Sequence, residues 1–221
     1  MKILDKYSIK PNNPHIYEIA FIHESYANEH DLSECYERLE FLGDSVLDLV
    51  VSKYLYKKNP KMSEGELTNT RSNYVCKQAL FYYSTEIGID KNVRLGVGET
   101  LSHREKDSIV SDIFESFLGA IYIDQGINKV TEVIYDIVIP HIESKEIFFK
   151  DYKSELKTLC DSLECEVNYK ILKEEGKPHE KIFTIGAIIK DNCYGVGVGG
   201  SKKEAQQNAA MYALQSVDEY K

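Results

Sequence analysis

The sequence predicts a multidomain protein: an all-α region, residues 1–149, followed by a small α+β region, residues 150–221, with the element order α-β-β-β-α. Before about residue 150, apolar residues recur with helical spacing, and breaks separate the helical segments at Asn59-Pro60, Gly88, Gly96 to Gly98, Gly126 and Pro140. After residue 150, three short runs rich in β-branched and aromatic residues lie between a polar helical segment and an alanine-rich one.

Composition limits the class of protein. With 221 residues, of which 43% are hydrophobic, the chain can form one large or two modest cores. No apolar run approaches about 18 residues and the charged N-terminus is no secretory signal, so we expect neither a membrane-spanning nor a secreted protein. Five cysteines without a Cys-x-x-Cys pair are typical of free thiols in a reducing compartment, which favours a cytoplasmic location. Cys160 and Cys165 are too isolated from other ligands to form a zinc site.

The formal net charge of −9 lies mostly in the first region. Residues 1–149 carry 16 Lys and Arg against 24 Asp and Glu, a net charge of −8, whereas residues 150–221 carry 11 against 12, a net charge of −1. Proteins that bind nucleic acid commonly present a basic surface. The total charge therefore neither supports nor excludes binding to nucleic acid. Only the local arrangement of charged residues bears on that question.

Acidic residues recur at helical spacing on two segments that are otherwise apolar. Glu37, Glu40 and Asp44 follow an i, i+3, i+7 pattern, which places them on one stripe of a helix, and Asp112 and Glu115 pair at i, i+3. Carboxylates are seldom buried unless they are paired or bind a metal. Oxygen ligands without His or Cys suit a hard cation such as Mg²⁺ or Mn²⁺, and these ions usually act on phosphate substrates. The pattern therefore indicates phosphoryl chemistry.

The alternative is that these acids lie on a solvated helix face, paired with Arg38 or Arg104. Their apolar neighbours favour the metal site, because they leave little of the first helix polar. These neighbours are Leu39, Phe41, Leu42, Val46, Leu47, Leu49, Val50 and Val51. We therefore expect a buried helix.

Longer motifs around these acids resemble the ribonuclease III family. Residues 37–45, with the sequence ERLEFLGDS, are similar to its signature, and residues 111–122 are similar to its second acidic helix. Further family features recur in order at His23 to Glu29, at Ser63 to Thr68 with Arg71, and at Leu95 to Glu99. The resemblance covers nearly the whole chain and implies that residues 1–149 form an all-α ribonuclease III endonuclease domain.

The second region is expected to begin with a helix at residues 152–162, followed by strands at residues 167–171, 181–188 and 192–198. Ser201 is expected to cap a last helix, whose small residues suit packing on a sheet. The segments Gly176 to His179 and Gly199 to Ala205 resemble motifs of the double-stranded RNA-binding domain, which this region is therefore expected to form. A helix N-terminus with lysines binds phosphate, and a turn can reach 2′-hydroxyls in the minor groove. The RNA-binding residues implied are Ser154, Lys157, Lys177, Pro178, His179, Ser201, Lys202 and Lys203.

The resemblance implies metal-dependent hydrolysis of double-stranded RNA that leaves 5′-phosphate and 3′-hydroxyl ends with short 3′ overhangs. The implied cofactor is Mg²⁺, for which Mn²⁺ would substitute. Attack by the 2′-hydroxyl of the RNA would instead need a general base such as paired histidines, and the six histidines form no such cluster in the sequence. The implied metal ligands are Glu40, Asp44, Asp112 and Glu115, with Asp44 and Glu115 catalytic, and Glu37 and Glu64 are implied as supporting acids.

The resemblance also implies a homodimer, because a two-fold pair would set one site against each strand of a duplex. The apolar face of the signature helix, including Phe41, is expected to pack against its copy. Asp48, one turn beyond Asp44, is outside the family motif, and we expect it to be a solvated helix residue.

Five positions depart from the family pattern, and none of them is an implied metal ligand. The departures therefore bear on affinity and substrate preference and leave the implied activity unchanged. They are Ile22, Tyr36, Lys157, Thr158 and Gln206.

Two other functions compete with the nuclease. A ribonuclease III-like scaffold would hold duplex RNA without cutting it, but all four implied ligand positions are intact. A metal-dependent phosphohydrolase of small molecules would give no reason for the second region. The family resemblance favours an enzyme of RNA processing and decay, and it leaves open whether the natural substrates are ribosomal precursors, messenger hairpins or foreign duplexes.

Overall fold

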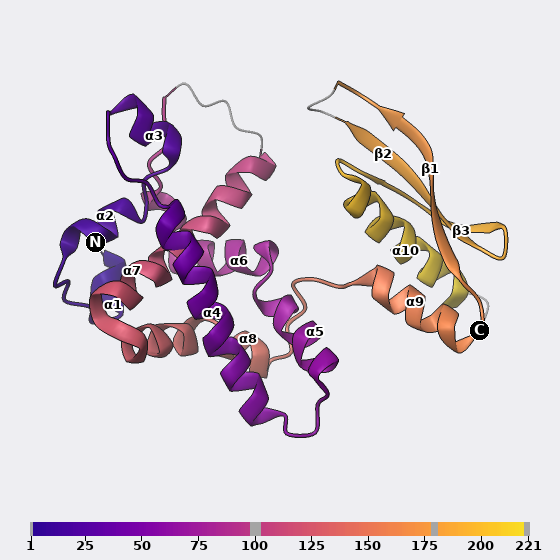
Figure 1. The fold of residues 1–221 in the computed structure, drawn as a ribbon, viewed down its shortest axis with the longest axis horizontal. Coiled ribbons are helices and arrows are strands. Elements are labelled where there is room, and N and C mark those ends of the chain that lie inside the picture. Colours follow the sequence, from indigo (N-terminus) through magenta and orange to yellow (C-terminus); the bar gives the residue numbers. More distant parts are fainter. Residues whose placement is uncertain (1, 98–102, 178–180, 219–221) are drawn as a thin grey trace. The chain divides into compact units, whose positions relative to one another are not determined.

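The structure is a computed structural model that describes residues 2–97, 103–177 and 181–218. The chain divides into two compact units, Met1–Phe149 and Lys150–Lys221 (Figure 1). In the described residues, the first unit is helical and the second contains a three-stranded antiparallel sheet. The predicted fold class is therefore confirmed.

Short connections join the helices of the first unit, and local sequence explains several of their ends. Ser63 caps α5 through a capping box, in which the Glu66 side chain accepts the Ser63 N–H at 2.7 Å. Gly88 ends α6 in the left-handed conformation. The helices are α1 (Lys2–Lys6), α2 (Pro14–Ile19), α3 (Glu24–Glu29), α4 (Glu37–Lys58), α5 (Glu64–Tyr74), α6 (Lys77–Ile87), the 3₁₀ helix η1 (Asp90–Asn92), α7 (His103–Ile137) and α8 (Ile139–Glu143).

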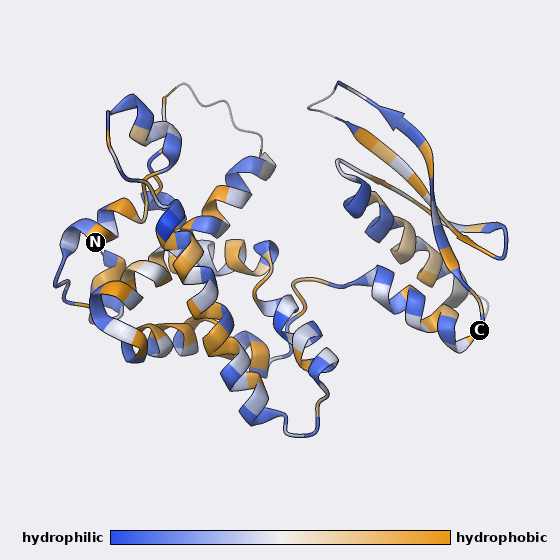
Figure 2. Cartoon of the chain, viewed as in Figure 1, coloured by the Kyte–Doolittle hydropathy of each residue, from blue (hydrophilic) through white to orange (hydrophobic). Residues whose placement is uncertain are grey.

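Helices α4 and α7 pack side by side, and their apolar residues form much of the core of the first unit (Figures 1 and 2). At Gly126, where the sequence predicts a break, α7 contains a non-helical residue with φ 81°. No described helix combines the length and the apolarity that crossing a membrane requires. Fully buried side chains of this core include Leu47, Leu55, Leu80, Tyr83, Phe114, Phe117, Leu118 and Ile121.

Within the single chain the expected buried helix α4 is buried toward α7, and Phe41, which is expected to pack against a copy of the helix, lies on an exposed face. Phe41 is 79% exposed and Leu49 is 59% exposed, although both are large and apolar. Only the opposite face of α4 packs against α7, where Leu47 and Val51 are fully buried. Exposed apolar surface of this kind is typical of a site where another molecule binds.

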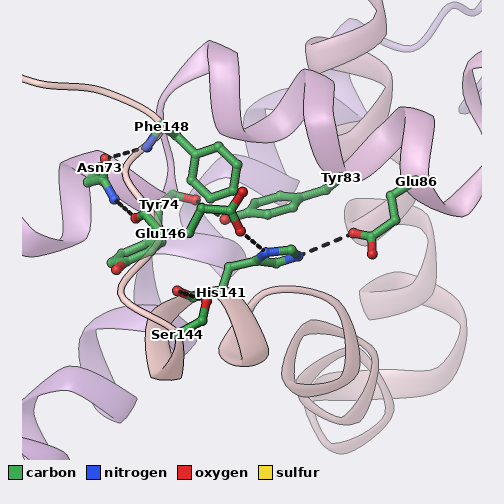
Figure 3. Close-up of polar contacts among 8 residues, drawn as sticks. All are labelled: Asn73, Tyr74, Tyr83, Glu86, His141, Ser144, Glu146 and Phe148. Atoms are coloured by element: carbon green, nitrogen blue, oxygen red, sulfur yellow. Dashed lines mark hydrogen bonds and ion pairs between the residues drawn. The ribbon is translucent and has the colours of Figure 1, made fainter.

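A buried histidine fixes the segment that follows α8 (Figure 3). His141 Nδ1 lies 2.6 Å from a carboxylate oxygen of Glu146, and Nε2 lies 3.2 Å from one of Glu86 on α6. Asn73 of α5 accepts the Phe148 N–H at 2.9 Å and donates to the Glu146 carbonyl at 2.8 Å. The last residues of the first unit are therefore held to both α5 and α6.

The second unit contains α9 (Tyr152–Ser162), β1 (Val167–Glu175), β2 (Ile182–Ile189), β3 (Asn192–Gly199) and α10 (Lys202–Asp218). The strands pair in the order β1-β2-β3. Leu156 and Cys160 of α9 share a core with Ala187 of β2 and with Ala209 and Ala213 of α10, so both helices pack on one face of the sheet.

Glycines in β3 let α10 approach closely. A Cβ at Gly197 would lie 2.1 Å from the Ala209 nitrogen, and one at Gly195 would lie 2.3 Å from the Ala209 oxygen. This contact explains the small residues on one face of α10. Strand β1 continues to Glu175, past the expected end at Ile171, because its exposed end still pairs with β2. Because both faces of this extension are exposed, its sequence lacks the alternation of apolar and polar residues that predicts a strand.

Candidate active site

Two glycines let α4 and α7 cross with their backbones in contact. A Cβ at Gly43 of α4 would lie 1.8 Å from the backbone oxygen of Glu115, and one at Gly119 of α7 would lie 2.2 Å from that of Leu39. Both distances are far inside van der Waals contact, so neither position has space for a side chain. Residues one turn from this crossing on the two helices are therefore forced together.

Three of the implied metal ligands meet beside the crossing. Glu40 of α4 and Asp112 and Glu115 of α7 each present a carboxylate oxygen, and these oxygens lie within 4.8 Å of one another. We call these three residues the acid cluster. A set of carboxylate oxygens without His or Cys suits a hard divalent cation, so the residues present fit Mg²⁺ or Mn²⁺.

The fourth implied ligand, Asp44, borders the acid cluster without belonging to it. Asp44 is exposed one turn beyond Glu40 on α4. Its charge is nevertheless close enough to be the strongest cause, after burial, of the raised pKa of Glu115. Asp44 is thus on the solvent side of the cluster.

The surroundings of the acid cluster disfavour the ionised form of its carboxyl groups. Burial, followed by the charges of Asp44, Glu40 and Asp112, raises the pKa of Glu115 to about 8. Burial, followed by the charge of Asp112, raises the pKa of Glu40 to about 7, and Lys77 opposes this rise. A divalent cation would reverse the repulsion, because it binds the deprotonated form of each ligand.

Lys77, the first residue of α6, contacts the acid cluster and was not among the implied site residues. Its Nζ lies 3.3 Å from Asp112 Oδ1 and donates to Ser108 Oγ at 2.6 Å. No local pattern predicts this contact, since Lys77 and Asp112 are 35 residues apart and only the packing of α6 on α7 joins them. Of the arginines considered as partners, Arg38 is exposed, and the side chain of Arg104 is outside the described residues.

The other acids singled out in the sequence are less enclosed. Glu37 is exposed at the start of α4, and Glu64 is exposed at the start of α5, where it accepts a hydrogen bond from Thr68 Oγ1 at 3.2 Å. The prediction that Asp48 is a solvated residue is wrong, because its half-buried side chain pairs with Arg71 at 3.5 Å. Packing of α5 beside α4 brings Arg71 to this position.

The motifs upstream of the two acidic helices support the fold around the site. Glu29 of α3 accepts the Val97 N–H at 2.9 Å, which joins the two motifs. The His23 ring lies 5.8 Å from the ring of Tyr36, a buried residue that directly precedes α4. The rest of the later motif, residues 98 and 99, is outside the described residues.

In the second unit, the implied RNA-binding residues lie at the starts of two helices and after one strand. Ser154 and Lys157 are exposed on α9, and Lys177 is exposed after β1. Ser201 caps α10 by accepting the N–H of Glu204 at 3.2 Å. Lys202 and Lys203 are exposed on the first turn of α10, and Pro178 and His179 are outside the described residues.

Asp151 connects the starts of α9 and α10. It accepts the Ser154 N–H at 3.1 Å and the Gln207 side-chain amide at 2.8 Å. Burial opposes its ionisation, but the hydrogen bonds from Gln207 and Ser154 outweigh burial and lower the pKa of Asp151. Gln206, one of the departures from the family pattern, accepts a hydrogen bond from Lys153 Nζ at 2.6 Å.

Comparisons with known proteins match both units. A family model described as Ribonuclease-III-like matches residues 13–142, and one described as Double-stranded RNA binding motif matches residues 152–217. Ribonuclease 3 of Streptococcus pneumoniae (strain Taiwan19F-14) is 40% identical over 214 residues, which cover 95% of this chain and 92% of that protein. Ribonuclease 3 of Bacillus cereus (strain G9842) is 44% identical over 205 residues, which cover 90% and 84%.

Solved structures match the first unit. A nuclease domain of ribonuclease III from Campylobacter jejuni, described as flexible in a region involved in dimer formation, is 28% identical with a TM-score of 0.57. The match covers 63% of this chain and 95% of that one. A second structure of the same nuclease domain gives 28% identity and a TM-score of 0.55, and covers 67% and 97% of the two chains.

We expect Gly119→Ala to weaken Mn²⁺ binding at least about tenfold, because its Cβ would push α4 away from α7 and separate Glu40 from Asp112 and Glu115. Electron paramagnetic resonance of free Mn²⁺ measures this binding. Gly65→Ala is the matched control, since a Cβ at that helical glycine meets nothing within 4 Å. Wild-type Mn²⁺ affinity in Gly119→Ala would contradict the role of the crossing.

We expect Glu115→Gln to stabilise the metal-free protein at high pH. The pKa of Glu115 is about 8 in the folded state and about 4.3 in an unfolded chain. The folded state therefore binds the proton more tightly, and stability falls as the pH rises between these values. In chelator at pH 8.5, urea unfolding should give a variant more stable by about 2–4 kcal/mol, a gain that disappears near pH 4.

Glu37→Gln is the control for this measurement, because Glu37 is exposed on the same helix stripe as Glu40. It should change the free energy of unfolding little at either pH. If Glu115→Gln raises the free energy of unfolding equally at both pH values, ionisation of Glu115 does not destabilise the folded protein.

Proposed function

Since the chain belongs to the ribonuclease III family and is an endoribonuclease of double-stranded RNA, we propose that it cuts with a divalent cation held by Glu40, Asp112 and Glu115. The observation that carries this proposal is the meeting of three carboxylate oxygens within 4.8 Å at a helix crossing. A bound Mg²⁺, for which Mn²⁺ substitutes, supplies positive charge at the scissile phosphate and activates water for in-line attack.

Each acid has a role that its position supports. Glu40, Asp112 and Glu115 would hold the cation, and Glu115, whose pKa is raised, would have to give up its proton to do so. Asp44, exposed beside the cluster, completes the ligand set from the solvent side and acts with Glu115 as a catalytic residue. Glu37 and Glu64 are exposed and support the site indirectly.

The products follow from the nucleophile. Water would attack the phosphorus and give up a proton while the bond between phosphorus and the 3′-oxygen breaks and that oxygen takes up a proton, so the ends are a 5′-phosphate and a 3′-hydroxyl. Cuts on the two strands are staggered and leave short 3′ overhangs. We propose that the enzyme acts in the cytoplasm in the processing of ribosomal and messenger RNA and in RNA decay.

The second unit is proposed to bind the duplex through the starts of α9 and α10. Exposed lysines at a helix N-terminus attract phosphates, and the bond between Asp151 and Gln207 holds the two helix starts in register. The residues proposed to contact RNA are Ser154, Lys157, Lys177, Pro178, His179, Ser201, Lys202 and Lys203.

A homodimer is proposed to place one active site against each strand. Phe41 is 79% exposed on α4 beside a groove lined in part by Leu39, Leu42 and Ile123. The same groove is lined by charged residues, among them Glu34 and Arg38, and an exposed aromatic residue next to such a mixed surface suits a self-complementary, two-fold contact. A two-fold pair matches the local symmetry of the antiparallel strands of a duplex.

We expect wild-type protein with Mg²⁺ to cut labelled duplex RNA, and chelator to stop the cutting without releasing the RNA. Glu115→Gln should cut at least about a thousandfold more slowly, because it lacks a metal ligand, yet bind the duplex with similar affinity. Gel analysis measures cutting and filter binding measures affinity. Glu132→Gln, an exposed acid elsewhere on α7, is the control and should cut normally.

Tight duplex binding by wild-type protein without cutting in Mg²⁺ would contradict the nuclease proposal and favour an RNA-binding scaffold. Cutting that is unaffected by Glu115→Gln would place the chemistry outside the acid cluster.

We expect Phe41→Glu to convert a dimer into a monomer, since a charge at the centre of an apolar contact opposes its burial. Sedimentation velocity measures the mass. Tyr212→Glu, at an exposed aromatic residue of α10, should leave the dimer intact. A wild-type monomer, or a dimer that survives Phe41→Glu, would contradict the proposed interface.

A further inference from the structure

We propose that Lys77 is a positioning residue of the acid cluster, which holds Asp112 in the metal-free enzyme and is displaced by the entering divalent cation. This inference rests on the proposed function, because it assigns a role at the same metal site. Its consequence is that cation binding is an exchange of one positive group for another, so that Lys77 lowers the affinity of the site for metal.

The backbone of Lys77 is held on α7, and its exposed ammonium also donates to Ser108 Oγ at 2.6 Å. The Ser111 hydroxyl, 1% exposed as a residue, donates to the Lys77 carbonyl at 2.9 Å, and Ser84 of α6 donates to the Val110 carbonyl at 2.9 Å. These bonds fix α6 on α7, the first at the start of α6 and the second near its end. The Lys77 side chain is 65% exposed, whereas that of Asp112 is 15% exposed. The ammonium therefore reaches an enclosed carboxylate from the solvent side.

The contact engages a carboxylate that a cation would need. Lys77 Nζ lies 3.3 Å from Asp112 Oδ1, and Asp112 is one of the three residues whose oxygens lie within 4.8 Å of one another. An ammonium at this position partly neutralises the cluster, and its charge opposes the raised pKa of both Glu40 and Glu115.

A divalent cation held by Asp112 and an ammonium paired with the same carboxylate would repel each other. The lysine stem is long, flexible and exposed, so it can swing into solvent while α6 stays in place. Asp112 thus has a positively charged partner whether or not the metal is bound. We infer that the exchange keeps Asp112 oriented between metal-binding events.

Mn²⁺ binding by Lys77→Met tests the exchange in the full chain without RNA. The measurement is made at pH 8.5 to limit competition from protons, which the loss of Lys77 would strengthen because its charge opposes the raised pKa of both Glu40 and Glu115. Electron paramagnetic resonance of free Mn²⁺ should give an affinity about fivefold tighter than wild type, the size expected for loss of one partly exposed charge contact. Lys77→Arg, which keeps the charge, should bind Mn²⁺ within about twofold of wild type.

Lys91→Met is the charge control, because Lys91 is an exposed lysine on η1, and it should leave Mn²⁺ affinity unchanged. An equal or weaker Mn²⁺ affinity in Lys77→Met would overturn the exchange. A purely structural ion pair would lower stability in urea without tightening Mn²⁺ binding, so that result also counts against the exchange.

Glu115→Gln separates the two proposals. If this variant loses Mn²⁺ binding while Lys77→Met binds like wild type, the metal site stands and only the exchange fails. If Glu115→Gln binds Mn²⁺ as well as wild type, the ion does not occupy the acid cluster, and both proposals are wrong.

Discussion

The close crossing of α4 and α7 is the constraint on which the rest of this structure depends. Gly43 and Gly119 each face the backbone of the other helix, where even a methyl group would overlap a carbonyl oxygen. Helices usually pack about 8–10 Å apart because side chains separate them. Without side chains at this point the two backbones touch, and acids on both helices come within reach of a common ion.

This arrangement is electrostatically unfavourable without a cation. Glu115 and Glu40 are enclosed among other carboxylates, so burial and mutual repulsion raise the pKa of each. The surrounding apolar core, including Phe114 and Phe117, fixes α7 and prevents the acids from moving apart. Functional sites commonly hold such unfavourable groups, because the stability comes from the rest of the fold. Lys77 offsets part of the negative charge from a third helix.

Local sequence predicts much of this fold and less of the site. Helical spacing identifies the stripe of Glu40 and the pair of Asp112 and Glu115, and the alternating runs predict the three strands. Spacing does not distinguish Asp48, which lies on the same stripe, because its pairing with Arg71 depends on the packing of α5. Nor does it identify Lys77, whose contact with Asp112 depends on the packing of α6.

The exposure of Phe41 also depends on packing that local sequence does not show. Within the first unit Phe41 stays exposed because α7 and α5 pack on other parts of α4, and local sequence does not show which face of a helix its neighbours leave uncovered. Both glycines of the crossing are visible in the sequence. Their role in the close approach of the two helices is not visible there, because it depends on which helix packs against each glycine.

Anomalous diffraction from crystals grown with Mn²⁺ tests the central claim most directly, because it locates the ion relative to the two helices. The account predicts an anomalous peak within about 2.5 Å of carboxylate oxygens of Glu40, Asp112 and Glu115, beside the Gly43 and Gly119 crossing. A fully occupied Mn²⁺ site elsewhere, with no peak among these three residues, would contradict it.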